Sequence, residues 1–285
     1  MTLKLIEFPK LAKFQKFGKF SLLFLFISAC SVISQQQQKV VPIHLNIIQK
    51  IELDFIPQKC CYSSTEKTAF IIEKNSNIIH IYQNGKRINK IGGLGFEKHN
   101  FTKLSDIKTA PDGNLLALDS FEKKIKKFDT EGKWITEFEI ENIGEPGLFD
   151  ISSDETFYIF DENRKEIVVT KKFGENNIYT FGKFQIDKPQ QLTKTLNYIL
   201  IYDKVNDKTT FFESLGQFVK ESPGYYQTDK FQDFKLSRFA LEHPDSEKIL
   251  AVSVFPWKFF EIKNNLCLLL SEKEMWIAEF VYERR

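Results

Sequence analysis

Short runs of apolar residues, separated by polar turns, recur along most of the chain. Three of these runs are LLAL, FYIF and ILIY, and each run ends at an aspartate, namely Asp119, Asp161 and Asp203. Consecutive apolar positions are typical of strands that are packed on both faces. No long stretch shows the 3.6-residue apolar period of an amphipathic helix. The pattern therefore predicts an all-β chain.

The three aspartates recur at intervals of 42 residues, and three glycines follow at the same interval, namely Gly132, Gly174 and Gly216. Around the first aspartate, strand and turn segments alternate from IKT at 107–109 to KWITEF at 133–138. The intervening Pro-Asp-Gly and Glu-Gly steps are turn sequences, because glycine adopts positive φ without steric cost. The repeat therefore predicts a four-stranded antiparallel meander.

A four-stranded unit of this length is typical of a β-propeller blade, because one such sheet cannot bury both faces alone. The 255 residues after the first 30 suffice for about six units of this period, with five as the alternative. We expect blades roughly at 55–99, 100–142, 143–184, 185–226 and 227–263, and a closing blade that combines 264–285 with 40–54. Because the aspartates and glycines recur in each copy, we interpret them as structural residues of the turns.

The repeat resembles the NHL type, in which a turn, an apolar strand ending in Asp, a basic-apolar strand and a glycine turn recur. Residues 101–142 and 143–184 carry the resemblance best, 185–226 carries it less well, and the ends match poorly. The resemblance implies a six-bladed propeller of the NHL family.

The register of the repeat slips by eight residues after Gly216, which indicates an insertion at 224–232. This segment contains Tyr225, Tyr226 and Phe231. Aromatic loops on a propeller face are typical of recognition surfaces, so a binding loop is one interpretation of this segment. The alternative is that these rings cover the edges of blades.

The first 29 residues have the parts of an export signal in order. A lysine-rich start precedes the apolar run Phe20–Ile27, and the small residues Ser28 and Ala29 follow. A membrane-spanning helix needs about 20 apolar residues, and this run is far shorter. Residues 1–29 are therefore predicted to be a signal peptide rather than a stop-transfer helix.

Ile27-Ser28-Ala29-Cys30 resembles the lipobox of bacterial lipoproteins. The resemblance implies cleavage before Cys30 and lipidation of that residue, which would then anchor the protein to a membrane. Residues 30–45, with four consecutive glutamines, would form a polar tether. Ser31 implies the outer membrane as the destination. An ordinary signal peptide that happens to end near Cys30 is the alternative.

The charge balance excludes a broad basic surface for nucleic acid. The chain has 40 basic and 38 acidic residues, hence a net charge of +2. Five lysines and one glutamate lie in residues 1–30, so the remainder carries a net charge of −2. With 42% hydrophobic residues, including 29 phenylalanines, the chain has ample material for a core.

Three cysteines follow Cys30, and two interpretations of them stay open. Cys60, Cys61 and Cys267 are either three half-buried thiols or include one bridge from Cys267 to one of the adjacent pair. No zinc-like ligand spacing or common catalytic motif occurs, so neither a metal nor a cofactor is expected. The four histidines share no register: His44, His80, His99 and His243.

These features predict a lipid-anchored binding or scaffolding module of the cell envelope. The expected partners are the membrane and an envelope protein or small ligand, whose identity the sequence leaves open. The alternative is a propeller enzyme, a metal-dependent hydrolase or lyase with its site at the central channel. The NHL resemblance implies this alternative as well, because related propellers include lactonases and lyases with acidic, Asn or His residues on their inner strands.

Overall fold

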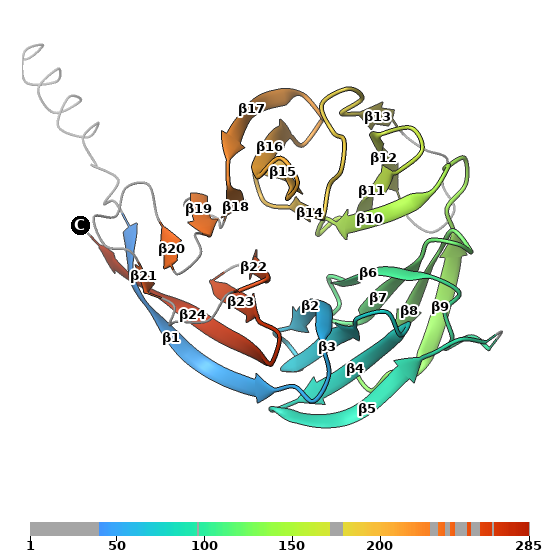
Figure 1. Ribbon diagram of the computed structural model, residues 1–285, viewed down its shortest axis with the longest axis horizontal. Helices are drawn as coiled ribbons and strands as arrows, with labels where there is room; N and C mark the ends of the chain where they lie inside the picture. Colours follow the sequence, from blue (N-terminus) through green and yellow to red (C-terminus); the bar gives the residue numbers. More distant parts are fainter. Residues whose placement is uncertain are drawn as a thin grey trace, which may run out of the picture. The chain divides into compact units, whose positions relative to one another are not determined.

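Antiparallel hairpins follow one another along the chain (Figure 1). The computed structural model describes residues 40–284, except 96, 172–178, 229–232, 237–239, 243–249, 252–256 and 264. Residues Val40–Glu283 form one unit. Within the described residues, the strands form six four-stranded sheets. No helix that is long and apolar enough to cross a membrane occurs in this part of the chain.

Five sheets each consist of four consecutive strands, and we number them as blades along the chain. Blade 1 contains β2 (Pro57–Ser63), β3 (Thr68–Glu73), β4 (Ile78–Gln83) and β5 (Lys86–Gly92). Blade 2 contains β6 (Leu104–Thr109), β7 (Leu115–Asp119), β8 (Lys124–Phe128) and β9 (Trp134–Glu139). Blade 3 contains β10 (Pro146–Ile151), β11 (Thr156–Asp161), β12 (Glu166–Lys171) and β13 (Tyr179–Phe181).

The remaining blades complete the ring. Blade 4 contains β14 (Gln191–Lys194), β15 (Tyr198–Asp203), β16 (Lys208–Glu213) and β17 (Phe218–Pro223). Blade 5 contains β18 (Tyr225–Thr228), β19 (Asp233–Leu236), β20 (Ala240–Glu242) and β21 (Leu250–Ala251). Blade 6 contains β22 (Phe259–Lys263), β23 (Leu266–Leu270) and β24 (Glu274–Arg284), together with β1 (Val40–Glu52) from the other end.

The six sheets surround a common centre, and the first strand of each blade lies toward it (Figure 1). Neighbouring inner strands contact one another: β2 contacts β6, and β6 contacts β10. The predicted all-β propeller of four-stranded blades is therefore confirmed. Within each blade the first and second strands join at one face of the ring, which we call the mouth face. The second and third strands join at the opposite face.

Blade 6 is built from both ends of the described chain, in the order β1, β24, β23, β22. The sequence analysis placed residues up to 263 in the preceding blade. In the structure, β22 pairs with β23, with Phe259 opposite Leu270 and Lys263 opposite Leu266. β22 is therefore the inner strand of blade 6. Because β1 covers the outer edge of β24, the ring closes with a sheet that is shared between the two ends.

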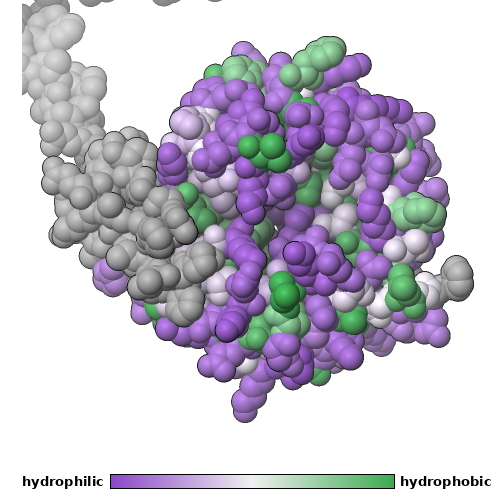
Figure 2. Space-filling model, viewed as in Figure 1, coloured by the Kyte–Doolittle hydropathy of each residue, from purple (hydrophilic) through white to green (hydrophobic). Residues whose placement is uncertain are grey.

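The hydrophobic core lies between adjacent blades. Phe70 of blade 1 packs in one cluster with Phe128 of blade 2, and Phe149 of blade 3 packs with Leu116 of blade 2. Burial on both faces explains why the second strands are apolar at consecutive positions, since each face meets a different blade. The face drawn in Figure 2 is mainly hydrophilic, with hydrophobic side chains in small separate groups.

The repeated aspartates connect each blade to the one before it. The carboxylate of Asp161 accepts hydrogen bonds from backbone N–H groups on the connection from blade 2 and on its own turn, namely those of Gly144, Glu145, Asn163 and Arg164. Asp119 has the same pattern, with the N–H groups of Thr102, Lys103, Phe121 and Glu122. Asp203 accepts from Val205 and Asn206.

These backbone donors favour the charged form of the Asp161 carboxyl. Burial alone would raise its pKa, but the N–H groups of Gly144 and Arg164 outweigh burial and hold the pKa below its ordinary value. The ionised carboxylate therefore stabilises the fold at neutral pH.

The repeated glycines adopt positive φ in the turns between third and fourth strands. Gly132 has φ of +91° and Gly216 has φ of +85°. A Cβ atom on Gly216 would lie 2.4 Å from the Phe181 ring, so both backbone conformation and packing require glycine there. Gly174 lies outside the described residues.

The three described cysteines are free thiols, so of the two open interpretations the bridge to Cys267 is wrong, and the thiols are buried rather than half-buried. Cys60 packs between blades 6 and 1, where Leu268 faces it. Cys267 precedes Leu268 in β23, so it lies on the other face of that strand and packs toward blade 5. Strand alternation therefore keeps the two sulfur atoms on opposite sides of blade 6.

Candidate functional site

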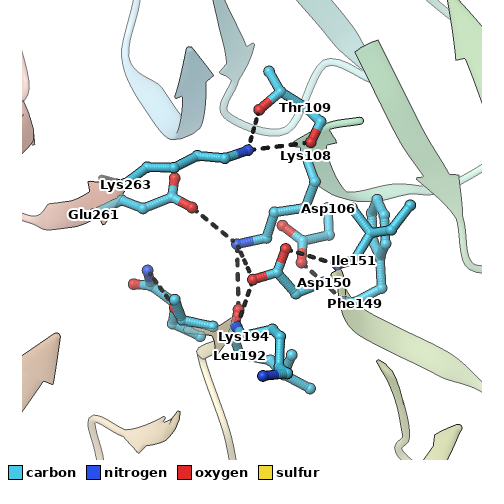
Figure 3. Close-up of polar contacts among 12 residues, drawn as sticks. Asp106, Lys108, Thr109, Phe149, Asp150, Ile151, Leu192, Lys194, Glu261 and Lys263 are labelled. Carbon is cyan, nitrogen blue, oxygen red and sulfur yellow. Dashed lines mark hydrogen bonds and ion pairs between the residues drawn. The ribbon is translucent and has the colours of Figure 1, made fainter. Parts of the chain in front are cut away.

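A network of buried charges joins four inner strands at the centre of the ring (Figure 3). Lys108 of β6 donates through Nζ to the carbonyl oxygen of Leu192 in β14, at 3.2 Å. The same Nζ lies 3.5 Å from Oε1 of Glu261 in β22 and 4.0 Å from Oδ2 of Asp150 in β10. Lys108, Asp150 and Leu192 follow one another at the 42-residue interval and so occupy equivalent positions in three blades.

The Lys108 ammonium stays charged in this network. Burial on its own lowers the pKa of a lysine, but the carboxylates of Asp150 and Glu261 outweigh burial and raise the pKa of Lys108 above its ordinary value. Asp150 also accepts hydrogen bonds from the N–H groups of Ile151 and Lys194, at 2.8 and 2.6 Å. The ammonium group of Lys108 thus stabilises two carboxylates and holds the blades together.

A second buried ion pair lies beside the first. Lys59 of β2 donates through Nζ to Oδ1 of Asp106 in β6, at 2.9 Å. Asp106 also accepts the N–H of Phe149 in β10, at 3.1 Å. Burial lowers the pKa of Lys59, and the Asp106 carboxylate offsets part of this effect. This pair joins blades 1, 2 and 3.

Neutral polar groups of β14 and β18 also form hydrogen bonds between the inner strands. Gln227 of β18 donates through Nε2 to Oγ1 of Thr193, at 3.0 Å. Gln191 donates to the carbonyl oxygen of Phe260, at 3.4 Å. The Oε1 atom of Gln227 is buried without a hydrogen-bond partner among the described residues.

The two described tyrosines of the predicted binding loop lie in a strand instead. Tyr225 belongs to β18, is buried, and donates its hydroxyl to the carbonyl oxygen of Phe260, at 2.6 Å. Its ring stacks on that of Tyr202. Tyr226 belongs to the same strand and is half-buried. The aromatic residues here serve the contact between blades 4, 5 and 6, while Phe231 lies outside the described residues.

A cavity of about 770 Å³ opens on the mouth face of the ring. We call it the mouth cavity. It is formed by the turns between first and second strands of blades 1, 2, 3 and 4 and by the end of β22. Its polar lining is rich in hydroxyl groups, contributed by Tyr62, Ser63, Ser64, Thr65, Thr109, Ser152, Ser153, Tyr158, Thr195 and Ser214.

Two lysines and one aspartate supply the charges of the mouth cavity. Lys263 donates through Nζ to Oγ1 of Thr109, at 2.6 Å. Lys194 donates to the carbonyl oxygen of Thr195 and to Oγ of Ser214, at 2.5 and 3.2 Å. Among the residues that the structure describes, no carboxylate oxygen lies within 4.0 Å of either ammonium group. These two lysines therefore differ from Lys108, whose charge is compensated.

The carboxylate of the cavity, Asp154, already accepts hydrogen bonds from residues of its own turn. Asp154 accepts hydrogen bonds from the hydroxyls of Ser152 and Thr156, and the bond from Ser152 lowers its pKa. Burial lowers the pKa of Lys194, an effect that Asp150 and Asp154 partly offset. Burial raises the pKa of Tyr158 to about 12, so its phenol is neutral at physiological pH. The cavity thus offers hydroxyls and ammonium groups as hydrogen-bond donors.

The histidines do not gather at this site. His80 contacts Glu73 at 2.9 Å and stacks on Phe55 within blade 1. His44 lies on β1, and His99 is exposed beside Glu97. Within the described part of the chain, no three His, Cys, Asp or Glu side chains are placed to hold a metal ion. His243 and Cys30 lie outside the described residues.

Sequence reasoning missed both the charge network and the mouth cavity. The signal for the network was present, because the 42-residue interval that relates the aspartates also relates Lys108 to Asp150. A signal for the cavity lay in the hydroxyl-rich turns SST at 63–65 and SS at 152–153. Neither signal shows from sequence alone which ends of the strands meet.

Comparison with known proteins gives likeness in structure only. No protein-family model matches the chain, and no curated protein matches it. A streptogramin B lyase structure superposes with a TM-score of 0.55 and 9% identity, over 82% of this chain and 97% of the lyase. A catalytically inactive virginiamycin B lyase from Staphylococcus aureus, determined with quinupristin, superposes with a TM-score of 0.55 and 13% identity. The match covers 87% of this chain and 98% of that lyase.

The propeller domain of another protein is similar to nearly the same degree. The β-propeller domain of Cps50 (Swd1) from Myceliophteria thermophila superposes with a TM-score of 0.54 and 10% identity, over 83% of this chain and 100% of that domain. At such identities the likeness concerns the fold alone. The chain is therefore a β-propeller protein.

Proposed function

We propose that the chain is a lipid-anchored, NHL-type binding propeller of the cell envelope, and that the mouth cavity is its ligand site. The observation that carries this proposal is the contrast between two groups of charges. Lys59 and Lys108 are neutralised by Asp106, Asp150 and Glu261 at the centre of the ring. Lys194 and Lys263 line the cavity, form no ion pair within 4.0 Å among the described residues and donate only to neutral oxygen atoms, so they can bind an anionic ligand.

The sequence Ile27–Cys30 supports the anchor, and the topology of blade 6 supports its direction. The N–H of Leu53 donates to the carbonyl oxygen of Lys273, at 2.8 Å, so β1 ends beside the turn between β23 and β24. That turn lies on the face opposite the mouth. Because β1 runs across the whole blade, it starts at Val40 on the mouth face.

The tether would therefore leave the propeller from the face that carries the cavity. Nine residues lie between Cys30 and Val40, and the ten residue-to-residue steps from Cys30 to Val40 span at most about 36 Å when fully extended. An anchor at Cys30 would thus keep the mouth face close to the membrane, and Ser31 favours the outer membrane. Envelope ligands at the membrane surface would meet the cavity first.

The anchor is tested by Cys30→Ser in cells that are fed a labelled fatty acid. We expect loss of the label and release of the protein from the membrane fraction, while Cys61→Ser keeps both. Unchanged labelling of Cys30→Ser would refute lipidation at this residue.

The ligand site is tested with a photo-crosslinking residue at Leu196, on the rim of the mouth cavity. Phe121 is the matched control, because it is equally exposed (72% against 73%) and lies on a turn between second and third strands, on the opposite face. We expect the envelope ligand to be trapped at Leu196 only. Equal trapping at both positions would refute the cavity as the site, and conversion of the trapped ligand to a product would favour the propeller enzyme.

A further inference from the structure

The chemistry of the mouth cavity restricts the kind of ligand that it can bind. Its charged groups are two lysines and one aspartate, and the aspartate is already held by Ser152 and Thr156. Lys194 and Lys263 each use Nζ to contact neutral oxygen atoms only, at Thr195, Ser214 and Thr109. A phosphate or carboxylate would exchange these neutral acceptors for charged ones, which form stronger hydrogen bonds.

The hydroxyl groups around the lysines extend the recognition beyond a single anion. Serine hydroxyls come from turns on different sides of the cavity, including those of Ser64 and Ser153. Each hydroxyl can donate and accept, which matches the hydroxyls of a sugar. Tyr62 and Tyr158 add aromatic surface to the lining. The volume of about 770 Å³ lies in the usual range for small-molecule sites and is far larger than a free phosphate needs.

We propose that the mouth cavity binds an acidic carbohydrate, a sugar unit that carries a phosphate or a carboxylate. This inference rests on the proposed binding function and names its ligand class. Lys194 and Lys263 hold the acidic group, and the serine and threonine hydroxyls of the turns bind the sugar hydroxyls.

Such a unit can come from two sources, which share this chemistry. It can be a soluble sugar acid or sugar phosphate, or it can be the headgroup of a lipid in the membrane that the mouth face approaches. Leu196 and Leu215 are exposed beside the cavity, at 73% and 81%, and give its rim an apolar part. That rim suits the boundary between a headgroup and its acyl chains, as well as the ring carbons of a sugar.

Calorimetric titration of the full lipoprotein in detergent micelles tests the ligand class. The probes are glucose 6-phosphate, glucuronic acid, glucose and inorganic phosphate. We expect both acidic sugars to bind at least about tenfold more tightly than glucose and than inorganic phosphate. Equal affinity for glucose and glucose 6-phosphate, or no binding of either acidic sugar, would overturn the proposal.

Variants locate the binding in the cavity. Lys263→Gln removes an exposed lysine and should weaken glucose 6-phosphate binding about tenfold without a change in thermal stability. Lys194→Gln should do the same. Lys273→Gln, an exposed lysine on the opposite face, is the matched control and should bind as the wild type does. Equal affinities of all three variants would overturn the assignment.

The two sources are separated by reconstitution. The lipoprotein is placed in phosphatidylcholine vesicles that also contain either phosphatidylinositol or phosphatidylserine. If glucose 6-phosphate binds more weakly in the phosphatidylinositol vesicles than in the phosphatidylserine vesicles, the natural ligand is a lipid headgroup. Equal binding in the two kinds of vesicle supports a soluble sugar. If Leu196 traps an envelope ligand while no acidic sugar binds or competes, the ligand class is wrong and the proposed function stands. If Leu196 traps nothing that Phe121 does not, the proposed function fails.

Discussion

Lys108 and Glu261 are separated by 153 positions in the sequence, yet the Nζ and Oε1 atoms of these residues lie 3.5 Å apart. The contact crosses the centre of the ring and connects blade 2 to blade 6. Because Asp150 and the carbonyl oxygen of Leu192 contact the same ammonium group, four of the six described blades meet at one side chain. The centre of the ring is therefore a structural junction.

Replacing the lysine of this junction should strongly destabilise the protein. Lys108→Met leaves Glu261 and Asp150 buried without their cation, and loss of one partner from a buried ion pair costs about 3 to 5 kcal/mol. Denaturant unfolding measures the change in the free energy of unfolding. The double variant Lys108→Met with Glu261→Gln should recover part of that loss, because it removes one of the stranded charges. A loss in the free energy of unfolding below about 1 kcal/mol would show that the network contributes no more than an exposed surface ion pair.

The aspartate between blades 2 and 3 should contribute a comparable amount. Asp161→Ala removes the acceptor of four backbone N–H groups and should cost about 3 kcal/mol, since orphaned buried donors are expensive. Asp161→Asn keeps one acceptor oxygen and should cost less. Thermal unfolding of the two variants provides the comparison, and equal losses would show that the amide oxygen gives no advantage.

The same residue should make the fold sensitive to acid. The folded pKa of Asp161 lies below its ordinary value of 3.8, so the stabilisation is fully present above that value and is lost as the pH falls through the folded pKa. The wild type and Asp161→Asn should therefore converge in stability at strongly acidic pH. A constant difference between them down to low pH would contradict this linkage.

Anion binding in the mouth cavity should weaken at alkaline pH. Burial lowers the pKa of Lys194 below 10.5, and only the protonated ammonium attracts an anion. In Lys263→Gln, where Lys194 is the remaining lysine of the cavity, glucose 6-phosphate affinity should fall as the pH rises through that lowered pKa. Titrations across the alkaline range follow the fall. An affinity of Lys263→Gln that stays constant across this range would refute the role of the Lys194 ammonium.

The free cysteines should be unreactive in the folded protein. Cys60, Cys61 and Cys267 are buried, and burial raises the pKa of each thiol, which removes the reactive thiolate. An aromatic disulfide reagent should titrate them only after denaturation. A reducing agent should leave the melting temperature unchanged. Rapid labelling of the native protein would contradict the packing between blades.

The regular part of the fold was predictable from sequence because the same physical requirement recurs in each blade. Asp119, Asp161 and Asp203 accept backbone N–H groups in equivalent turns, and that shared role produces their fixed interval. The interval in turn predicted four-stranded blades. Gly132 and Gly216 recur for the same reason, since equivalent turns need positive φ.

The candidate site was not predictable, because it depends on contacts between blades rather than within them. Glu261 reaches Lys108 only after the ring closes, and it lies outside the 42-residue interval. Tyr225 was interpreted as part of a loop because the repeat slips there. In the structure Tyr225 is instead a buried strand residue, and its ring packs against Tyr202 of blade 4 and Phe260 of blade 6.

The shared sheet of blade 6 has a consequence for the order of folding. β1 is synthesised well before its partner β24, so β1 stays unpaired until the chain up to β24 has been made. Contacts between distant parts of a chain slow folding, and this one spans nearly the entire described sequence. The sheet of blade 6 therefore cannot close the ring until β24 is available to pair with β1.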